Sequence, residues 1–295
     1  MSKRIYILLL TLTVLFSACE FKLKPNEEEG VSSTLQVQRY DRLESRYLTT
    51  GDFSALQQMN TAYPMQTRTL IEDMLELGEV NDPEINAKFL NFYQDTTLQT
   101  VIADVQTQYA DMDDINKQLD EAFKTLKTWI PDLQEPLIYS QIGALNQSIV
   151  VGDNLIGISL DKYLGSEYPI YKKFDYSPTQ LQSMKRSFIV PDCLCFYLLS
   201  LYPLKNFDMR PQEEKDLHMG KVMWTVNQVL GEQILKTDLT KRIDAYMKKH
   251  PNVTVKALLD TTTTPFSKIL THFHQSLSDQ SGKLMILQSP LRSNK

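Results

Sequence analysis

The stretch IVVGDNLIGISLDKYLGSEYPIY occupies residues 149–171 and decides the fold class. Asp153 and Asn154 stand between two apolar runs rich in β-branched residues, which predicts a β-hairpin with a two-residue turn. Residues 156–160 alternate large and small side chains with the period of two of a β-strand. The large residues bury one face of this strand, and Gly157 and Ser159 line the other. Such a face admits a closely packed helix or a ligand, and the sequence favours the helix.

A β-prone run at residues 137–139 adds a third strand. Elsewhere apolar residues recur at helical spacing. The segment after Pro191 is the most apolar and, at about eleven residues, is too short to cross a bilayer. The sequence predicts a predominantly helical α+β fold, with a small antiparallel sheet packed on this buried central helix. Residues 37–41 are predicted to be a short strand that runs into a helix, which is broken at Gly51-Asp52. The other predicted helices cover residues 67–77, 83–93, 96–109, 113–129, 177–188, 191–202, 211–230, 239–249 and 265–277, and residues 255–259 also belong to the ordered body.

The first eighteen residues have the pattern of a bacterial lipoprotein signal peptide. Lys3 and Arg4 form a basic start, an apolar run covers residues 5–16, and small residues directly precede Cys19. This arrangement resembles a lipobox, which implies cleavage before Cys19 and acylation of that cysteine. A plain secretory signal with a coincidental cysteine is the alternative. Residues 19–34 lack apolar periodicity and are predicted to be a flexible tether, so the lipid on Cys19 would hold the protein at a membrane.

Residues 35–278 show no internal repeat or shift in composition, which predicts one α+β domain followed by a weakly ordered tail at residues 279–295. The formal net charge of −5 and the absence of a basic cluster exclude a nucleic-acid partner. Cys193 and Cys195 are separated by a single residue, so a disulfide between them would need unusual geometry. They are predicted to be free buried thiols.

The histidines do not form a metal site if the predicted helices are right. His272 and His274 lie two positions apart, about 200° around a helix, and cannot face one ion. If residues 265–277 formed a strand instead, His272 and His274 could face one metal ion, and His218 could be a third ligand. His250 follows the helix at residues 239–249, where it is expected to interact with the negative helix end. No metal or cofactor is therefore predicted.

Other reactive side chains also have structural explanations. Cys193 and Cys195 stand in an apolar run without a nearby base, which argues against a nucleophile. The acidic pairs at residues 113–114 and 213–214 begin predicted helices, where the helix dipole stabilises them. Asp161 and Lys162, at the end of the predicted sheet, are the most site-like polar residues. A turn cap and a local ion pair are the favoured roles for them.

An ordered set of landmarks carries a family resemblance. The set comprises the lipobox at Cys19, residues 38–41 (QRYD), Tyr63-Pro64, Phe123 before Pro131, Gly143, Asp161-Lys162-Tyr163-Leu164-Gly165, Tyr168-Pro169, Tyr171, Pro191-Asp192 and Gly220-Lys221. Over about residues 35–230 the chain resembles the gliding-motility lipoprotein GldB family of Bacteroidota. The resemblance implies an outer-membrane lipoprotein associated with gliding or secretion machinery, with envelope proteins as partners. Asp161, Lys162, Tyr163 and Gly165 are hallmarks of this resemblance, as structural residues or as part of a site.

That family also resembles zinc-dependent peptidases, whose buried helix carries two zinc-binding histidines four residues apart in His-Glu-x-x-His. The buried helix of this chain has Asp192, Cys193 and Cys195 but no histidine. The resemblance therefore implies a zincin-like architecture without metal ligands and a non-enzymatic, docking role. A divergent hydrolase and a ligand-binding lipoprotein are the alternatives.

The acidic run at residues 27–29 resembles the surface-export signal of Bacteroidota lipoproteins. It begins eight residues after Cys19, which is late for that signal. A periplasm-facing orientation is therefore favoured over display on the cell surface.

Overall fold

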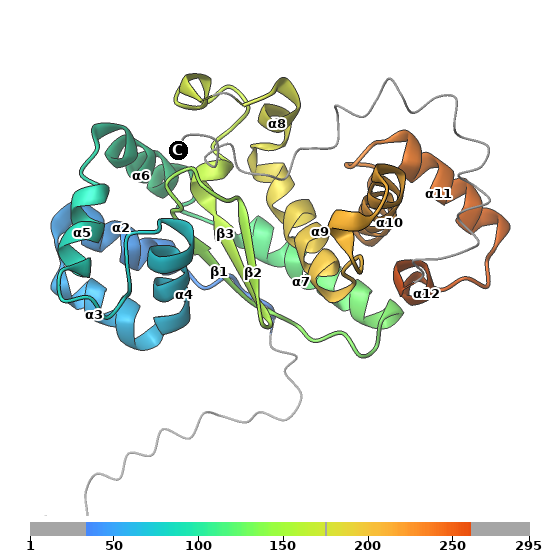
Figure 1. Cartoon of the computed structure of the whole chain (residues 1–295), viewed down its shortest axis with the longest axis horizontal. Helices are drawn as coiled ribbons and strands as arrows, with labels where there is room; N and C mark the ends of the chain where they lie inside the picture. Colours follow the sequence, from blue (N-terminus) through green and yellow to red (C-terminus); the bar gives the residue numbers. More distant parts are fainter. Residues whose placement is uncertain (1–33, 175, 261–295) are drawn as a thin grey trace, which may run out of the picture. The chain divides into compact units, whose positions relative to one another are not determined.

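The computed structural model describes residues 34–174 and 176–260. The chain divides into two units, Met1–Thr34 and Leu35–Lys295, and every described element belongs to the second (Figure 1). Several predictions fall outside the described residues: the signal peptide, Cys19, almost all of the tether, the helix at residues 265–277 with His272 and His274, and the tail.

A three-stranded mixed sheet lies at the centre of the second unit. It consists of β1 (Leu137–Gln141), β2 (Ile149–Gly152) and β3 (Leu155–Ser159) in the order β1-β3-β2. β2 and β3 form the predicted antiparallel hairpin, but β3 pairs with β1 in parallel. The prediction of a wholly antiparallel sheet was therefore wrong. The two-residue turn at Asp153 and Asn154 makes β3 antiparallel to β2. β3 then lies between β2 and β1, and it runs in the same direction as β1.

The outer edge of β1 is occupied by the chain segment that enters α2 (Tyr40–Thr50). Gln38 forms a parallel bridge with Tyr139. Its amide donates to the Ile138 carbonyl at 2.8 Å, and its carbonyl accepts the Ser140 amide at 2.9 Å. β2 is thus left as the edge strand of the sheet.

Helices surround the sheet, as the sequence predicted. The first group consists of α2, α3 (Phe53–Ala62), α4 (Pro64–Arg68), a π-helix (Thr69–Met74), α5 (Ile85–Phe92) and α6 (Thr96–Gln108). The second consists of α7 (Asp113–Trp129), α8 (Pro178–Ser183), α9 (Ile189–Leu201), α10 (Gln212–Leu230), α11 (Asp238–Lys249) and α12 (Val255–Asp260). Single 3-10 turns cover Leu160–Lys162, Tyr171–Lys173, Arg186–Phe188 and Phe207–Met209.

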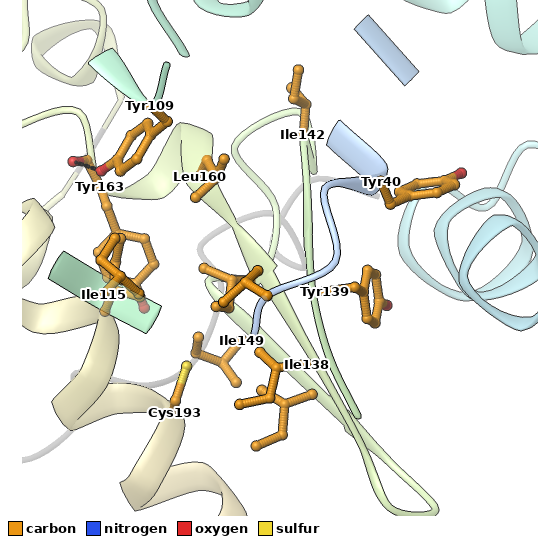
Figure 2. Close-up of a cluster of buried hydrophobic side chains, with 14 of the residues drawn as sticks. Tyr40, Tyr109, Ile115, Ile138, Tyr139, Ile142, Ile149, Leu160, Tyr163 and Cys193 are labelled. Carbon is orange, nitrogen blue, oxygen red and sulfur yellow. Dashed lines mark hydrogen bonds between the residues drawn. The ribbon is translucent and has the colours of Figure 1, made fainter. Parts of the chain in front are cut away.

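The two faces of the sheet have different neighbours. Figure 2 shows Ile138 and Ile149 on the side of Cys193 in α9, whereas Tyr139 points away from them towards Tyr40 of α2. The Tyr139 and Tyr40 rings meet edge to face with their centroids 6.1 Å apart. α9 is buried along most of its length, which confirms the predicted central helix beside the sheet.

Local sequence signals fix most helix ends. Ser177 and Gln180 form the capping box that begins α8, and Gly231 adopts the left-handed conformation that ends α10. α11 begins at Asp238, one residue before the predicted start, and the Thr237 hydroxyl caps it by accepting the Thr240 amide. The predicted helix at residues 67–77 instead begins at Pro64 and ends in the π-helix.

The core has two parts. The main cluster joins the sheet to the surrounding helices. A smaller cluster of Leu217, Trp224, Ile243 and Leu258 holds α10, α11 and α12 together. Among the described residues, no helix has the length and apolar composition needed to span a membrane.

Candidate functional site

Asp161, directly after β3, holds the loop that connects β1 to β2. Its Oδ1 accepts the Gly143 amide at 2.8 Å, and its Oδ2 accepts the Leu145 amide. Ala144 and Leu145 both have positive φ, a conformation that costs energy for residues with a side chain. Burial raises the pKa of Asp161, and the two amide hydrogen bonds oppose that rise. The carboxylate therefore stabilises a strained loop from inside the protein.

Lys162 also serves this loop. Its Nζ donates to the Leu145 carbonyl at 3.2 Å and to the Tyr176 hydroxyl at 3.0 Å, and it lies 4.4 Å from the centre of the Tyr176 ring. Burial lowers the pKa of Lys162 to about 8. Among the described residues, Lys162 and Asp161 attract each other electrostatically without forming a contact ion pair, because the Lys162 amine is directed at a carbonyl and a phenol.

Tyr163 and Gly165 complete the hallmark segment. The Tyr163 carbonyl accepts the Tyr109 hydroxyl at 2.6 Å, which ties the segment to the end of α6. Gly165 has a φ of +120°, and its amide donates to the Met184 carbonyl at 2.9 Å. Its own carbonyl accepts the Tyr168 amide at 3.0 Å, which forms the turn predicted there.

Glu44 of α2 is a buried carboxyl that the sequence reasoning missed. Its Oε2 accepts the Ile142 amide at 2.8 Å at the end of β1, and its Oε1 has no hydrogen-bond partner among the described residues. Burial and then the nearby carboxylates of Asp161 and Asp41 raise its pKa well above the usual range. Glu44 therefore binds its proton more tightly than an exposed glutamate does. The available signal was an acidic residue among the buried positions of α2, a set that also contains Asp41.

Asp192 gives the site its most reactive group. It lies half-buried in the first turn of α9, and its Oδ2 accepts the Tyr163 hydroxyl at 2.8 Å. The Ser148 side chain lies close to the Tyr163 phenol and opposes the rise that burial causes in the pKa of Tyr163. Burial raises the pKa of Asp192 to about 7, although the Tyr163 hydrogen bond lowers it. We call Ser148, Tyr163 and Asp192 the Asp192 cluster.

The Asp192 cluster can exchange a proton near neutral pH, because a group with a pKa of about 7 is populated in both forms there. Sequence reasoning assigned Asp192 no role in a site, although it marked the residue as a landmark beside Pro191 and as part of the buried helix. The sequence could not show its proximity to Tyr163, because the two side chains come from segments 29 residues apart.

The other candidates lie elsewhere and have structural partners. Cys193 and Cys195 are free buried thiols, as predicted, and burial raises the pKa of both. Asp114 pairs with Arg186, and Glu214 pairs with Arg210. The His250 ring approaches the Tyr246 carbonyl in the last turn of α11 at 2.9 Å, as expected for a helix end.

His218 of α10 is buried, and its Nε2 has no hydrogen-bond partner among the described residues. Desolvation by burial and the charge of Lys221 lower the pKa of His218, and a hydrogen bond to the Tyr202 backbone only partly opposes them. In residues 34–174 and 176–260, no three His, Cys, Asp or Glu side chains gather so that they could hold a metal ion.

Comparison with known proteins gives one match. A family model described as gliding motility protein GldB matches residues 21–238, which is more than half of the chain. No curated protein and no solved structure matches.

Proposed function

The chain belongs to the gliding motility protein GldB family, and from this premise we propose that it is a lipid-anchored envelope protein with a non-catalytic, docking role. Lipidation of Cys19, attachment to the outer membrane and a periplasm-facing orientation are parts of this proposal. The partners are other proteins of the envelope machinery for gliding or secretion. No cofactor is required.

One observation carries the docking role. The side chains that looked most like a site, Asp161 and Lys162, are directed at the backbone of residues 143–145 and at Tyr176. Their hydrogen-bonding capacity goes into maintaining a loop conformation at the end of the sheet. Asp161 and Lys162 are therefore not free to act on a substrate, and the rigid elements that they hold together suit a surface that binds a partner protein.

Crosslinking followed by affinity purification from native envelopes tests the role. The expected result is a defined set of envelope proteins that co-purify with the wild-type chain in stoichiometric amounts. A chain that purifies alone after crosslinking, under conditions that capture known envelope complexes, would remove the docking proposal.

The Asp192 cluster favours a second candidate, a divergent hydrolase in which Asp192 acts as a general base. A carboxylate with a pKa of about 7 beside a phenol suits that chemistry. Hydrolysis of an unfolded protein substrate, with a rate that rises through pH 7 and disappears in Asp192→Asn, would establish it. Equal rates in the wild type and Asp192→Asn would dismiss it.

A further inference from the structure

The outer edge of β2 carries backbone groups that no described element uses. The Ser159 amide donates to the Ser148 carbonyl at 3.0 Å, so Ser148 and Ser159 are a hydrogen-bonded pair. In an antiparallel ladder such pairs alternate with pairs that are not hydrogen-bonded. The register therefore directs the amide and carbonyl of Ile149 and of Val151 away from β3. Within the described residues, no other group bonds to these four.

This edge lacks the usual protection against strand pairing. Proteins protect edge strands with charged residues, prolines or bulges. β2 is four residues long, which limits the length of strand that can pair with it, but it reads Ile-Val-Val-Gly and pairs with β3 in regular register, so it has none of these three features. Val150 and Val151 are half-buried and Gly152 is exposed, while Ile149 is anchored in the core. The opposite edge of the sheet is closed by Gln38.

A carboxylate stands at one end of the open edge. Ser148 precedes β2 directly, and its side chain and the Asp192 carboxylate lie close to the same Tyr163 phenol. Asp192 makes no ion pair with any described cation. A positive group that approached from solvent would favour the ionised carboxylate, since an opposite charge stabilises it.

We propose that the outer edge of β2 binds an extended segment of an envelope partner protein as an added strand, with a lysine, arginine or terminal amine of that segment at Asp192. The outward amides and carbonyls of Ile149 and Val151 match the backbone of an extended peptide, and the Asp192 carboxylate favours a peptide with a positive group at that end. This inference rests on the proposed docking function and names the surface through which docking takes place.

A designed peptide is the probe, tested on the full mature chain in detergent. It alternates valine and threonine and has one terminal lysine, and a matched peptide has glutamate in place of the lysine. Amide hydrogen exchange should be fast at Ile149 and Val151 in the free chain and at least tenfold slower with saturating lysine peptide. Val150, which already pairs with Gly157, should not change. The glutamate peptide should bind at least fivefold more weakly.

Two variants at one position separate strand pairing from other binding. Val151→Pro removes the outward amide without removing a ladder hydrogen bond, and Val151→Thr retains that amide and the branched shape. Fluorescence anisotropy should show that the peptide binds Val151→Thr but not Val151→Pro, with both variants folded by circular dichroism. Equal binding to the two variants would overturn the inference. Free-chain exchange at Ile149 and Val151 as slow as at Val150 would also overturn it, even if Val151→Pro failed to fold.

Purification from native envelopes distinguishes this inference from the proposed function. Partners that co-purify with the wild type but not with folded Val151→Pro support both. If Val151→Pro retains the partners, the docking function stands but β2 is not the docking surface. If the wild type has no partners, both the docking function and the β2 surface are refuted. A doubled mass in light scattering that Val151→Pro abolishes would show that the occupant is a second copy of the chain, which contradicts the proposed partner.

Discussion

The ring of Tyr139 lies against Gly157 on the neighbouring strand, so closely that a Cβ at Gly157 would come within 2.5 Å of the Tyr139 hydroxyl oxygen. The two residues are register partners in the parallel pair β1 and β3. The sequence predicted that a helix packs against the small-residue face of β3. The tyrosine of the adjacent strand fills this position at Gly157 instead.

Gly157→Ala should therefore destabilise the protein by about 1–3 kcal/mol, the range for overpacking a well-filled core. The new methyl group must displace a fully buried ring, which cannot move without disturbing Tyr40. Urea unfolding measures the change. Gly152→Ala is the matched control in β2, since a Cβ there meets the Leu155 Cβ at an ordinary 3.8 Å. Equal losses in the two variants would refute the close contact.

Asp161→Asn should cost about 1–3 kcal/mol of unfolding free energy, although the side chain keeps its shape. Both carboxylate oxygens accept backbone amides, from Gly143 and Leu145. An asparagine must turn its NH₂ group towards one of these amides, which leaves two donors facing each other. The measurement is chemical denaturation, together with amide exchange at Leu145, which should accelerate.

A surface carboxylate provides the control for that substitution. Asp113→Asn, in the exposed first turn of α7, should change stability by less than about 0.5 kcal/mol. An Asp161→Asn variant as stable as this control would show that Asp161 does not hold the loop.

The sequence predicted those features of the fold that depend on local chemistry. The hairpin turn at Asp153 and Asn154, the capping box at Ser177 and the bounds of α7 follow from residues close together in the chain. The parallel pairing of β1 with β3 depends on which strand inserts between the other two, and side-chain alternation does not encode that choice.

The candidate site was less predictable, because it depends on contacts between distant segments. Asp161 was identified as site-like from its place after a strand. Its role is evident only from its hydrogen bonds to the loop at residues 143–145, which is distant in the sequence. Glu44 was overlooked because the sequence alone does not distinguish a buried carboxyl from a solvated one. Asp192 becomes unusual only when the fold buries it beside the Tyr163 phenol.

Cys19→Ser should release the protein from membranes, because it removes the proposed site of acylation. The expected outcome is a shift of nearly all of the protein from the membrane pellet to the soluble fraction after carbonate extraction. Cys195→Ala is the control, since that thiol is buried in α9 and should leave membrane attachment unchanged. Retention of Cys19→Ser in the pellet would show that another segment holds the protein at the membrane.

Asp192→Asn should change the pH dependence of stability in a defined direction. Burial raises the pKa of Asp192 from 3.8 to about 7 in the folded chain, so the folded state binds the proton more tightly than the unfolded state. The stabilisation from this proton is complete below about pH 4 and is lost as the pH rises through 7. Asparagine does not titrate and still accepts the Tyr163 hydrogen bond through its oxygen.

The variant should therefore gain stability relative to the wild type between pH 5 and pH 8, by about 1–3 kcal/mol after allowance for the partial exposure of Asp192. Denaturant titrations of both proteins across this range give the difference at each pH, in which the contributions of Glu44 and other groups cancel. Asp114→Asn should show no such trend between pH 5 and pH 8, because Arg186 lowers the pKa of Asp114 below its usual value and the difference from the wild type changes only as the pH falls below about 4. A difference between wild type and Asp192→Asn that stays constant from pH 5 to pH 8 would mean that Asp192 titrates as an ordinary surface carboxylate.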